Sequence, residues 1–305
     1  MKSGSSPLPR PVAAAAGIAL DRLYGEPDAA WHPVVHFGRA LNEFERRYYD
    51  DSRASGVRHA LSGTLVGVLA GCAIRSTAWA TGLAVGGRSL WRAAGDIAEA
   101  LAKGDVEGAR CLLPSLVGRD PTGLNEEEIA RAVVESVAEN TVDAIVAPVL
   151  WAALAGAPGA FGYRAVNTMD AMVGHHSARY EHYGWASARL DDIANWLPAR
   201  VAAVLVVLVR LNAGREIALA VTTQASAHPS PNSGVVEAAF AGALGVRLGG
   251  RNRYGDRVED RPLLGRGRPV GADDIAEAVR LSRDVATSLA FTLGIIGLAQ
   301  WWRRR

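Results

Sequence analysis

A run of 20 residues without a charged side chain, residues 144–163, limits what this chain can fold into. About 20 apolar residues in a helix are enough to cross the hydrocarbon core of a bilayer. A second uncharged run covers residues 285–302 and ends in two tryptophans that three arginines follow. Tryptophans followed by basic residues are typical of a helix that leaves the bilayer on its cytoplasmic side. The two runs together predict a helical membrane protein.

Residues 11–20, 60–85 and 197–212 are further candidate segments. The second is long enough to span but contains Arg75, and the third contains Arg200 and Arg210. Buried core helices of a soluble protein are the alternative, because short apolar runs occur in both classes. Little of the sequence alternates with a period of two, so we predict an all-α fold. Residues 1–305 would form a single polytopic membrane domain with amphipathic interfacial helices and sizeable polar loops.

The longest uncharged run, residues 144–163, could either cross the membrane or turn back within it. Pro148 and the Gly156-Ala157-Pro158-Gly159 sequence interrupt it, and proline removes a helix donor while glycine permits a sharp reversal. A straight 20-residue helix is about 30 Å long and would leave the polar groups on its two sides at opposite faces of the bilayer. We therefore predict a broken or re-entrant hairpin, with a simple span as the alternative.

Two amphipathic or capped helices are expected beside the apolar runs. Residues 87–103 place an apolar face along one side of a helix, as expected for a helix on a membrane surface or a protein core. Asn125 followed by Glu128 is a capping-box pattern and predicts the start of a helix that runs toward the longest apolar run.

The balance of charged residues limits the kinds of molecule that the chain can bind. The chain has 33 basic and 31 acidic residues, so it lacks the positive excess that nucleic-acid binding requires. Its two cysteines show no metal-ligand spacing. We expect a lipid bilayer as a partner and no nucleic acid.

Four carboxylates, Glu128, Glu135, Glu139 and Asp143, follow one another at spacings of seven, four and four residues. This spacing places them on one face of a helix, where like charges repel. Mg²⁺ takes oxygen ligands and bridges protein carboxylates to phosphate, so a magnesium site is one reading. The other interpretation is a solvated acidic face. Such faces usually contain basic residues between the acidic ones, and here only Arg131 is near enough.

A second polar region follows the longest run. Residues 167–195 are dense in carboxylate, amide and guanidinium groups, which are costly between membrane segments unless they are used. Further along, Ser230-Pro231-Asn232 predicts a loop that opens a helix near Val235. Its amides could hold a phosphate, or the loop could simply be a turn and a cap.

Several sequence blocks, in order, resemble the CobD/CbiB family of adenosylcobinamide-phosphate synthases. They are LDRLYGEP at 20–27, VGRD at 117–120, ESVAENTVD at 135–143, NTMDAMVG at 167–174, GWASARLDD at 184–192, and SPN at 230–232 with GALG at 242–245. Glu26 and the pair His175-His176 depart from the family pattern, which has aspartate at the first position and an aromatic residue and a lysine at the pair. A histidine would hold phosphate less strongly than a lysine near neutral pH.

The resemblance implies cobalamin biosynthesis at the cell (inner) membrane by a multi-pass enzyme. It implies ATP-dependent amide-bond formation, with Mg²⁺, between adenosylcobyric acid and (R)-1-aminopropan-2-ol or its phosphate. No glycine-rich phosphate loop is present, so nucleotide binding comes from the resemblance alone. Homo-oligomers or neighbouring enzymes of the cobalamin pathway are the expected protein partners.

The expected site residues fall into three groups. The catalytic candidates are Glu135, Glu139, Asp191 and Asp192, with either aspartate as the base. The candidate metal or ammonium ligands are Glu135, Glu139 and Asp143. The substrate-binding candidates are Asp21, Arg119, Asn140, Asn167, Asp170, Arg189, Ser230 and Asn232, with the two arginines on phosphate or corrinoid carboxylates.

Two functions from other classes compete with this one. A non-catalytic signalling relative of the family would have no need of the polar blocks, which are all retained. A small-molecule transporter could line its path with Arg75 and Arg200. The absence of paired inverted segments disfavours the transporter.

Overall fold

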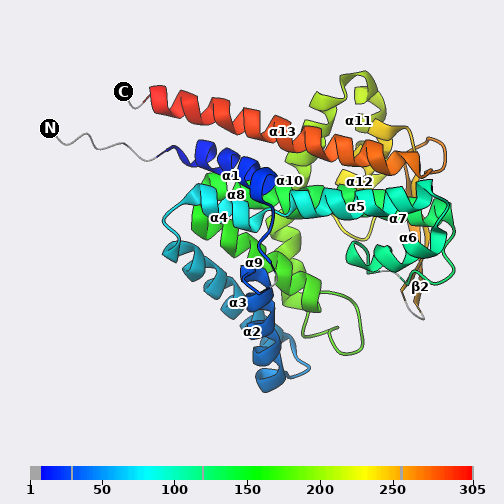
Figure 1. Cartoon of the computed structure of the whole chain (residues 1–305). Coiled ribbons are helices and arrows are strands. Elements are labelled where there is room, and N and C mark those ends of the chain that lie inside the picture. The colour runs from blue at the N-terminus through cyan, green and yellow to red at the C-terminus, as the bar shows by residue number, and fades with distance from the viewer. Residues whose placement is uncertain (1–7, 29, 119, 255–256, 304–305) are drawn as a thin grey trace. The chain divides into compact units, whose positions relative to one another are not determined.

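The computed structural model describes residues 8–28, 30–118, 120–254 and 257–303. These residues are mostly helical, with one antiparallel pair of strands (Figure 1). The chain divides into two compact units, each built from separate stretches of sequence. The first unit contains residues 1–86, 147–194 and 289–305, and the second contains residues 87–146 and 195–288.

The first unit is a bundle of helices. Its complete helices are α1 (Arg10–Tyr24), α2 (Pro33–Tyr48), α3 (Arg53–Ala73), α4 (Thr77–Ala84), α8 (Ala147–Ala155) and α9 (Ala157–Val173). It also contains the start of α10 (Trp185–Val209) and the end of α13 (Asp273–Trp302).

Small residues let α3 and α9 pack closely, and the two helices lie side by side in Figure 1. Gly63, Gly67 and Gly71 form one row along α3, at spacings of four residues. A Cβ atom added at Gly67 would lie 2.5 Å from Ala165 Cβ and 2.8 Å from the carbonyl oxygen of Phe161. Rows of small residues at this spacing are typical of helices that associate in membranes.

The longest apolar run is broken, as the sequence predicts. Helix α8 ends before Gly156, which has a φ of 72°, and α9 begins at the next residue. The two helices then pack against each other, since a Cβ atom at Gly159 would lie 2.2 Å from the carbonyl oxygen of Trp151. The break is confirmed, whereas the predicted re-entrant hairpin and its path in a membrane stay predictions.

The second unit contains the remaining elements. They are α5 (Gly87–Ala102), α6 (Val106–Leu112), α7 (Glu126–Thr141), the π-helix η2 (Val142–Val146), α11 (Gly214–Thr223), α12 (Ser233–Leu244), β1 (Leu248–Tyr254), β2 (Arg257–Leu264), the rest of α10, most of α13 and the short 3₁₀ helices η1 (Leu113–Ser115), η3 (Leu211–Ala213) and η4 (Ala225–Ala227). The predicted amphipathic helix is confirmed in α5, whose Leu90, Trp91 and Ile97 are buried. The predicted capping box of Asn125 and Glu128 is also confirmed at the start of α7.

The strand pair corrects the prediction of an all-α fold. β1 and β2 pair in antiparallel fashion, with Arg251 opposite Asp260. The Gly255-Asp256 dipeptide between the two runs is a hairpin signal in the sequence, but the strands carry charged residues on both faces and lack apolar alternation. Side chains of α7 hold β1, because Arg131 donates to the carbonyl oxygens of Gly249 and Arg251.

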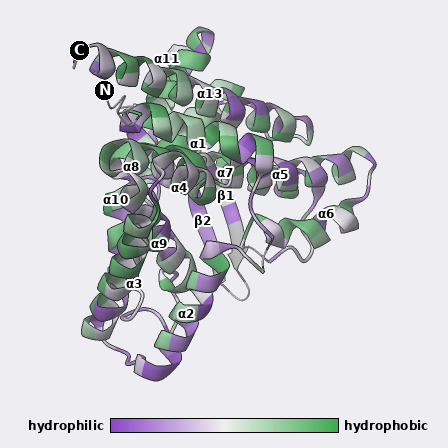
Figure 2. Ribbon diagram, turned by 60° about the vertical axis from the view of Figure 1, so that its left-hand side comes forward, coloured by the Kyte–Doolittle hydropathy of each residue, from purple (hydrophilic) through white to green (hydrophobic). Residues whose placement is uncertain are grey.

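Among the residues that the structure describes, three helices are long and apolar enough to span a membrane. They are the continuous helix of residues 126–155, α10 and α13. Large apolar side chains on α13 are exposed, including Phe291 at 71% and Ile295 at 67%, and Figure 2 shows hydrophobic residues along these helices. Such apolar surfaces are unusual on soluble monomers.

Two predicted segments have different limits in the structure. Residues 60–85 do not form one helix, because α3 ends at Ala73 and Ser76 caps the start of α4. The segment predicted at 197–212 belongs to α10, which begins twelve residues earlier at Trp185 and continues through Pro198 to Val209. Helix α10 therefore carries the acidic pair Asp191 and Asp192 in its first half.

Candidate functional site

The predicted site residues form two polar groups, one in each unit. Asp21, Asn167, Asp170, Arg189, Asp191 and Asp192 belong to the first unit. Glu135, Glu139, Asn140, Asp143, Ser230 and Asn232 belong to the second. Arg119 lies outside the described residues.

In the first unit, α9 and α10 bring several of these side chains together. The Asn167 Nδ2 atom donates to Asp191 Oδ1 at 3.4 Å, and Asn167 Oδ1 accepts from Arg164 Nη1 at 3.3 Å. Asp170 lies one helical turn beyond Asn167 on α9. Burial raises the pKa of Asp170, the charges of Asp191 and Asp192 raise it further, and together they bring it to about 7. A carboxyl group with this pKa can accept and release a proton near neutral pH.

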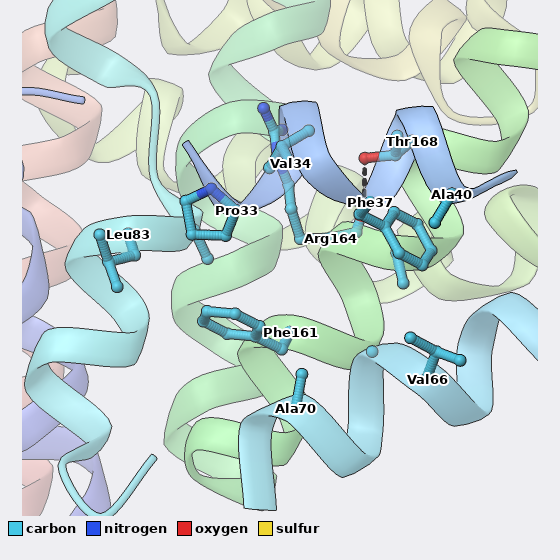
Figure 3. A pocket seen from close by; sticks show the side chains of 13 residues that line it. Pro33, Val34, Phe37, Ala40, Val66, Ala70, Leu83, Phe161, Arg164 and Thr168 are labelled. Carbon is cyan, nitrogen blue, oxygen red and sulfur yellow. Dashed lines mark hydrogen bonds between the residues drawn. The ribbon is translucent and has the colours of Figure 1, made fainter. Parts of the chain in front are cut away.

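An apolar cavity of about 240 Å³ lies beside this group (Figure 3). Pro33 and Phe37 of α2 face Phe161 of α9 across it. Arg164 contributes the charged side chain of the lining, and no described residue accepts a hydrogen bond from its buried Nε atom. Arg164 thus links the cavity to Asn167, and the sequence reasoning missed it because an arginine on an apolar helix shows no motif.

The other predicted residues of the first unit have simpler surroundings. Arg189 is exposed and lies 3.4 Å from Asp192 Oδ2, one turn along α10. Asp21 is buried in α1, where its carbonyl oxygen accepts from the amide of Gly25. Neither residue is joined by a described hydrogen bond to Asn167 or Asp170, so their predicted roles in substrate binding stay predictions.

In the second unit, Glu135 is held in place by the strand pair. Its Oε1 atom accepts from the amide of Gly249 at 2.7 Å, and only 1% of the residue is exposed. Glu139 lies one turn further along α7 and is half-buried. Because Glu135 is buried, the row of carboxylates from Glu128 to Asp143 is not a solvated acidic face.

Two residues that the sequence reasoning missed complete this group. Glu237 of α12 is fully buried, and its carboxyl group lies within hydrogen-bonding reach of Glu139. The Glu237 Oε1 atom lies 3.6 Å from Nε2 of the buried His228. Burial raises the pKa of Glu237 well above its usual range, and the nearby charges of Glu139 and Glu135 raise it further. Burial also lowers the pKa of His228.

The predicted loop at Ser230 positions His228 and starts α12. Ser230 Oγ accepts from the amides of Asn232 and Ser233. The Ser230 amide donates to His228 Nδ1 at 3.1 Å, and the Ser230 carbonyl oxygen lies 3.2 Å from the same nitrogen. Asn232 Oδ1 accepts from Arg200 Nη1 at 2.7 Å. The turn-and-cap role of the loop is therefore present, while phosphate binding stays a prediction.

The remaining polar residues of α7 and η2 are spread along the helix. Asn140 Nδ2 donates to the carbonyl oxygen of Ser136, and Asp143 lies in the π-helical turn. A π-turn inserts an extra residue and shifts the following side chains off the α-helical row. In the described part of the chain, no group of three or more His, Cys, Asp or Glu side chains is arranged to hold a metal ion.

The family model for the CobD/Cbib protein matches residues 14–282, which include both polar groups. The chain belongs to the CobD/CbiB family. CobD/CbiB relatives match it over nearly their whole length. A protein named cobalamin biosynthesis protein CobD from Mycobacterium tuberculosis is 47% identical, over 97% of each chain. A protein of the same name from Rhodobacter capsulatus is 37% identical, over 92% of this chain and 95% of the relative.

A third CobD of the same name, from Geobacter metallireducens, is 42% identical over 81% of this chain and 84% of the relative. No solved structure matches the chain. Membership of the CobD/CbiB family confirms the resemblance that the sequence blocks indicate.

Proposed function

We propose that this chain is a membrane enzyme of cobalamin biosynthesis that joins adenosylcobyric acid to (R)-1-aminopropan-2-ol or its phosphate through an amide bond. The names of the relatives support the pathway. The observation that carries the enzymatic part is Asp170, a carboxyl group with a pKa near 7 beside Asn167 and Asp191. A base with this pKa suits the removal of a proton from an amine near neutral pH.

The reaction requires an activated carboxyl group, because a carboxylate is a poor electrophile. In the proposed reaction, the substrate carboxylate takes the terminal phosphoryl group of ATP and releases ADP. The amine nitrogen then attacks the carboxyl carbon, phosphate leaves, and Asp170 accepts the proton lost by nitrogen. Arg164, at the wall of the adjacent cavity, supplies positive charge for an anionic group of a substrate.

Mg²⁺ would neutralise phosphate charge in this reaction. It commonly takes one or two protein carboxylates and completes its shell with water and phosphate oxygens. Glu135, Glu139 and Asp143 offer donors of this chemistry, although they do not form a preassembled group of three. Of these, Asp143 and Glu139 are the half-buried carboxylates that an incoming magnesium nucleotide could reach.

The first experiment is an assay of the purified protein with adenosylcobyric acid, (R)-1-aminopropan-2-ol phosphate, ATP and Mg²⁺. The proposed function predicts cobinamide phosphate and ADP in equal amounts, and the free amino alcohol tested in parallel identifies the preferred amine. Absence of both products with either amine would favour the signalling or transport alternatives.

Glu139→Gln should abolish turnover and leave membrane insertion intact. Glutamine keeps the size of the side chain but removes the negative charge that a cation in the second unit requires. Product formation and membrane-fraction yield are measured together, with Glu127→Gln as the control because Glu127 is exposed on the same helix. Near wild-type turnover in the Glu139 variant would exclude a required cation at this carboxylate.

The helical hairpin of α8 and α9 should return the chain to the side of the membrane from which α7 enters. Cysteines replacing Glu127 and Ala171, both exposed, report the two sides, whereas Ala138 is buried and would not react. The exposed Cys72 and Cys111 must first be replaced. A membrane-impermeant thiol reagent should modify both new cysteines from the same side, and modification from opposite sides would show a simple span.

A further inference from the structure

The apolar cavity beside Arg164 lies within the first unit, and one of its walls belongs to the protein surface. Helices α2, α3, α4 and α9 supply its lining (Figure 3). Val66 and Ala70 of α3 line the cavity and are also exposed, Val66 at 53%. The cavity volume of about 240 Å³ is below the roughly 300–1,000 Å³ of sites that enclose a whole drug-sized ligand. The cavity therefore suits one edge of a large molecule better than the whole of it.

Arg164 brings a positive charge to this cavity without a carboxylate to pair with. Its Nη1 atom donates to the amide oxygen of Asn167 at 3.3 Å, and its buried Nε atom has no hydrogen-bond partner among the described residues. Asn167 in turn donates to Asp191, so the nearest carboxylate reaches Arg164 only through a neutral amide. A buried charged donor is costly unless an acceptor reaches it. A carboxylate is the acceptor that best matches the planar fork of a guanidinium group.

The chemistry of the lining distinguishes between the three substrates of the proposed reaction. The amine carries an ammonium group, which the guanidinium group of Arg164 repels. ATP carries several phosphate groups, and the apolar lining would leave most of their oxygens without a donor. The Thr168 hydroxyl group does not change this, because it already donates to the carbonyl oxygen of Arg164 at 2.7 Å. The remaining substrate is a carboxylate on a ring system that carries methyl groups, and this combination matches an apolar cavity with one cation.

A carboxylate at Arg164 would lie on the path to the proposed base. Asn167 follows Arg164 by three residues on α9, and Asp170 follows Asn167 by three more. At a rise of about 1.5 Å per residue, Arg164 and Asp170 are separated by roughly 9 Å along the helix axis. This interval leaves room for an activated carboxyl group near Arg164 and an attacking amine near Asp170.

We infer that this cavity binds the apolar edge of the corrinoid substrate that carries the reacting carboxyl group, and that Arg164 pairs with that carboxylate. The identity of the corrinoid rests on the proposed function. The site itself rests on the cavity, its apolar lining and the unpartnered Nε atom of Arg164.

The test is equilibrium dialysis of adenosylcobyric acid against the purified full-length protein in detergent, without ATP or amine. The absorbance of the corrinoid measures the bound fraction and gives Kd. The methyl ester of the reacting carboxyl group keeps the ring system and removes the charge. Octanoate, a carboxylate on an acyl chain, tests whether the cavity takes a lipid-like molecule instead.

Two variants alter the two parts of the site separately. Arg164→Gln removes the charge, and Ala70→Phe places a large side chain at the exposed wall of the cavity. Arg58→Gln and Ala54→Phe are the matched controls, because both residues are exposed on α3 and lie outside the lining.

The wild type and both controls should bind the acid at least about tenfold more tightly than the ester, as expected for a charge-assisted pair. Arg164→Gln should bind the acid and the ester equally, at the affinity of the ester. Ala70→Phe should weaken both ligands by a similar factor of at least about ten, because it acts on the apolar part.

Equal affinity of the wild type for acid and ester would overturn the inference, and so would wild-type affinity for the acid in either variant. Displacement of the corrinoid by octanoate at a comparable concentration would also overturn it and assign the cavity to an acyl chain. If Arg164→Gln does not fold, Ala70→Phe and the comparison of acid with ester decide the result.

Steady-state kinetics separate this inference from the proposed function. Product formed by the wild type, with an unchanged KM for the corrinoid in both variants, overturns the site and leaves the function. Binding of the acid that depends on Arg164, with no product from the wild type, overturns the function and leaves the site. A raised KM for the corrinoid in both variants, with an unchanged KM for the amine, supports both.

Discussion

Asp170→Asn should reduce kcat by about a hundredfold to ten-thousandfold, the usual contribution of a general base. Asparagine fits the same space on α9, but it cannot accept a proton from the attacking amine. In the wild type, kcat should rise with pH through about 7, because burial and the two neighbouring aspartates raise the pKa of Asp170 to about that value. A base is active when deprotonated, so activity is lost as the pH falls below 7.

Initial rates between pH 5.5 and 9 measure this profile, and Asp96→Asn serves as the control because Asp96 is exposed on α5. Asp191→Asn removes one of the charges that raise the pKa of Asp170, so it should move the midpoint of the profile to lower pH. A wild-type rate in Asp170→Asn, or a profile without a midpoint between pH 6 and 8, would remove Asp170 from the role of base.

Gly67→Ala should lower the free energy of unfolding by about 1–3 kcal/mol, the usual cost of overpacking a close contact. The new methyl group would lie 2.5 Å from Ala165 Cβ and 2.8 Å from a backbone oxygen of α9, which cannot rotate away. Alanine is the better helix former by roughly 1 kcal/mol, so any loss of stability must come from the contact between α3 and α9.

Gly95→Ala provides the matched control for this change. Gly95 lies within α5, is exposed, and has no atom within 4 Å of the position of an added Cβ. Its replacement should leave the unfolding midpoint unchanged or raise it. Thermal unfolding in detergent measures both variants, and equal effects of the two replacements would show that α3 and α9 do not pack at Gly67.

Local signals in the sequence predicted much of the helical fold. The capping box at Asn125, the apolar face of α5 and the break at Gly156 each depend on residues within a few positions of one another. The strand pair was missed because its residues are stabilised by contacts from α7, about 120 positions away, rather than by an apolar alternation. The sequence analysis did not predict that α10 begins at Trp185 and includes Asp191 and Asp192, because Arg189 and its neighbours resemble a polar loop.

The candidate site was predictable where its residues formed motifs. Asn167 and Asp191 were named from the sequence, and the structure joins them by a hydrogen bond. The choice of Asp170 as the base depends on its burial, which spacing does not reveal. Glu237 lies in an apolar helix without a polar neighbour in sequence, and its relation to Glu139 exists only after α12 packs against α7.

The first unit takes its parts from both ends of the described sequence, with the second unit's segments between them. Helix α13 reaches α1 in this unit, since a Cβ atom at Gly297 would lie 2.4 Å from a side-chain carbon of Val12. A ribosome makes Val12 about 285 residues before Gly297, so α1 must wait for this neighbour until those residues have been made. Until then the Val12 side of α1 lacks this neighbour, and a chaperone or insertion factor that covers that side would have its longest opportunity there.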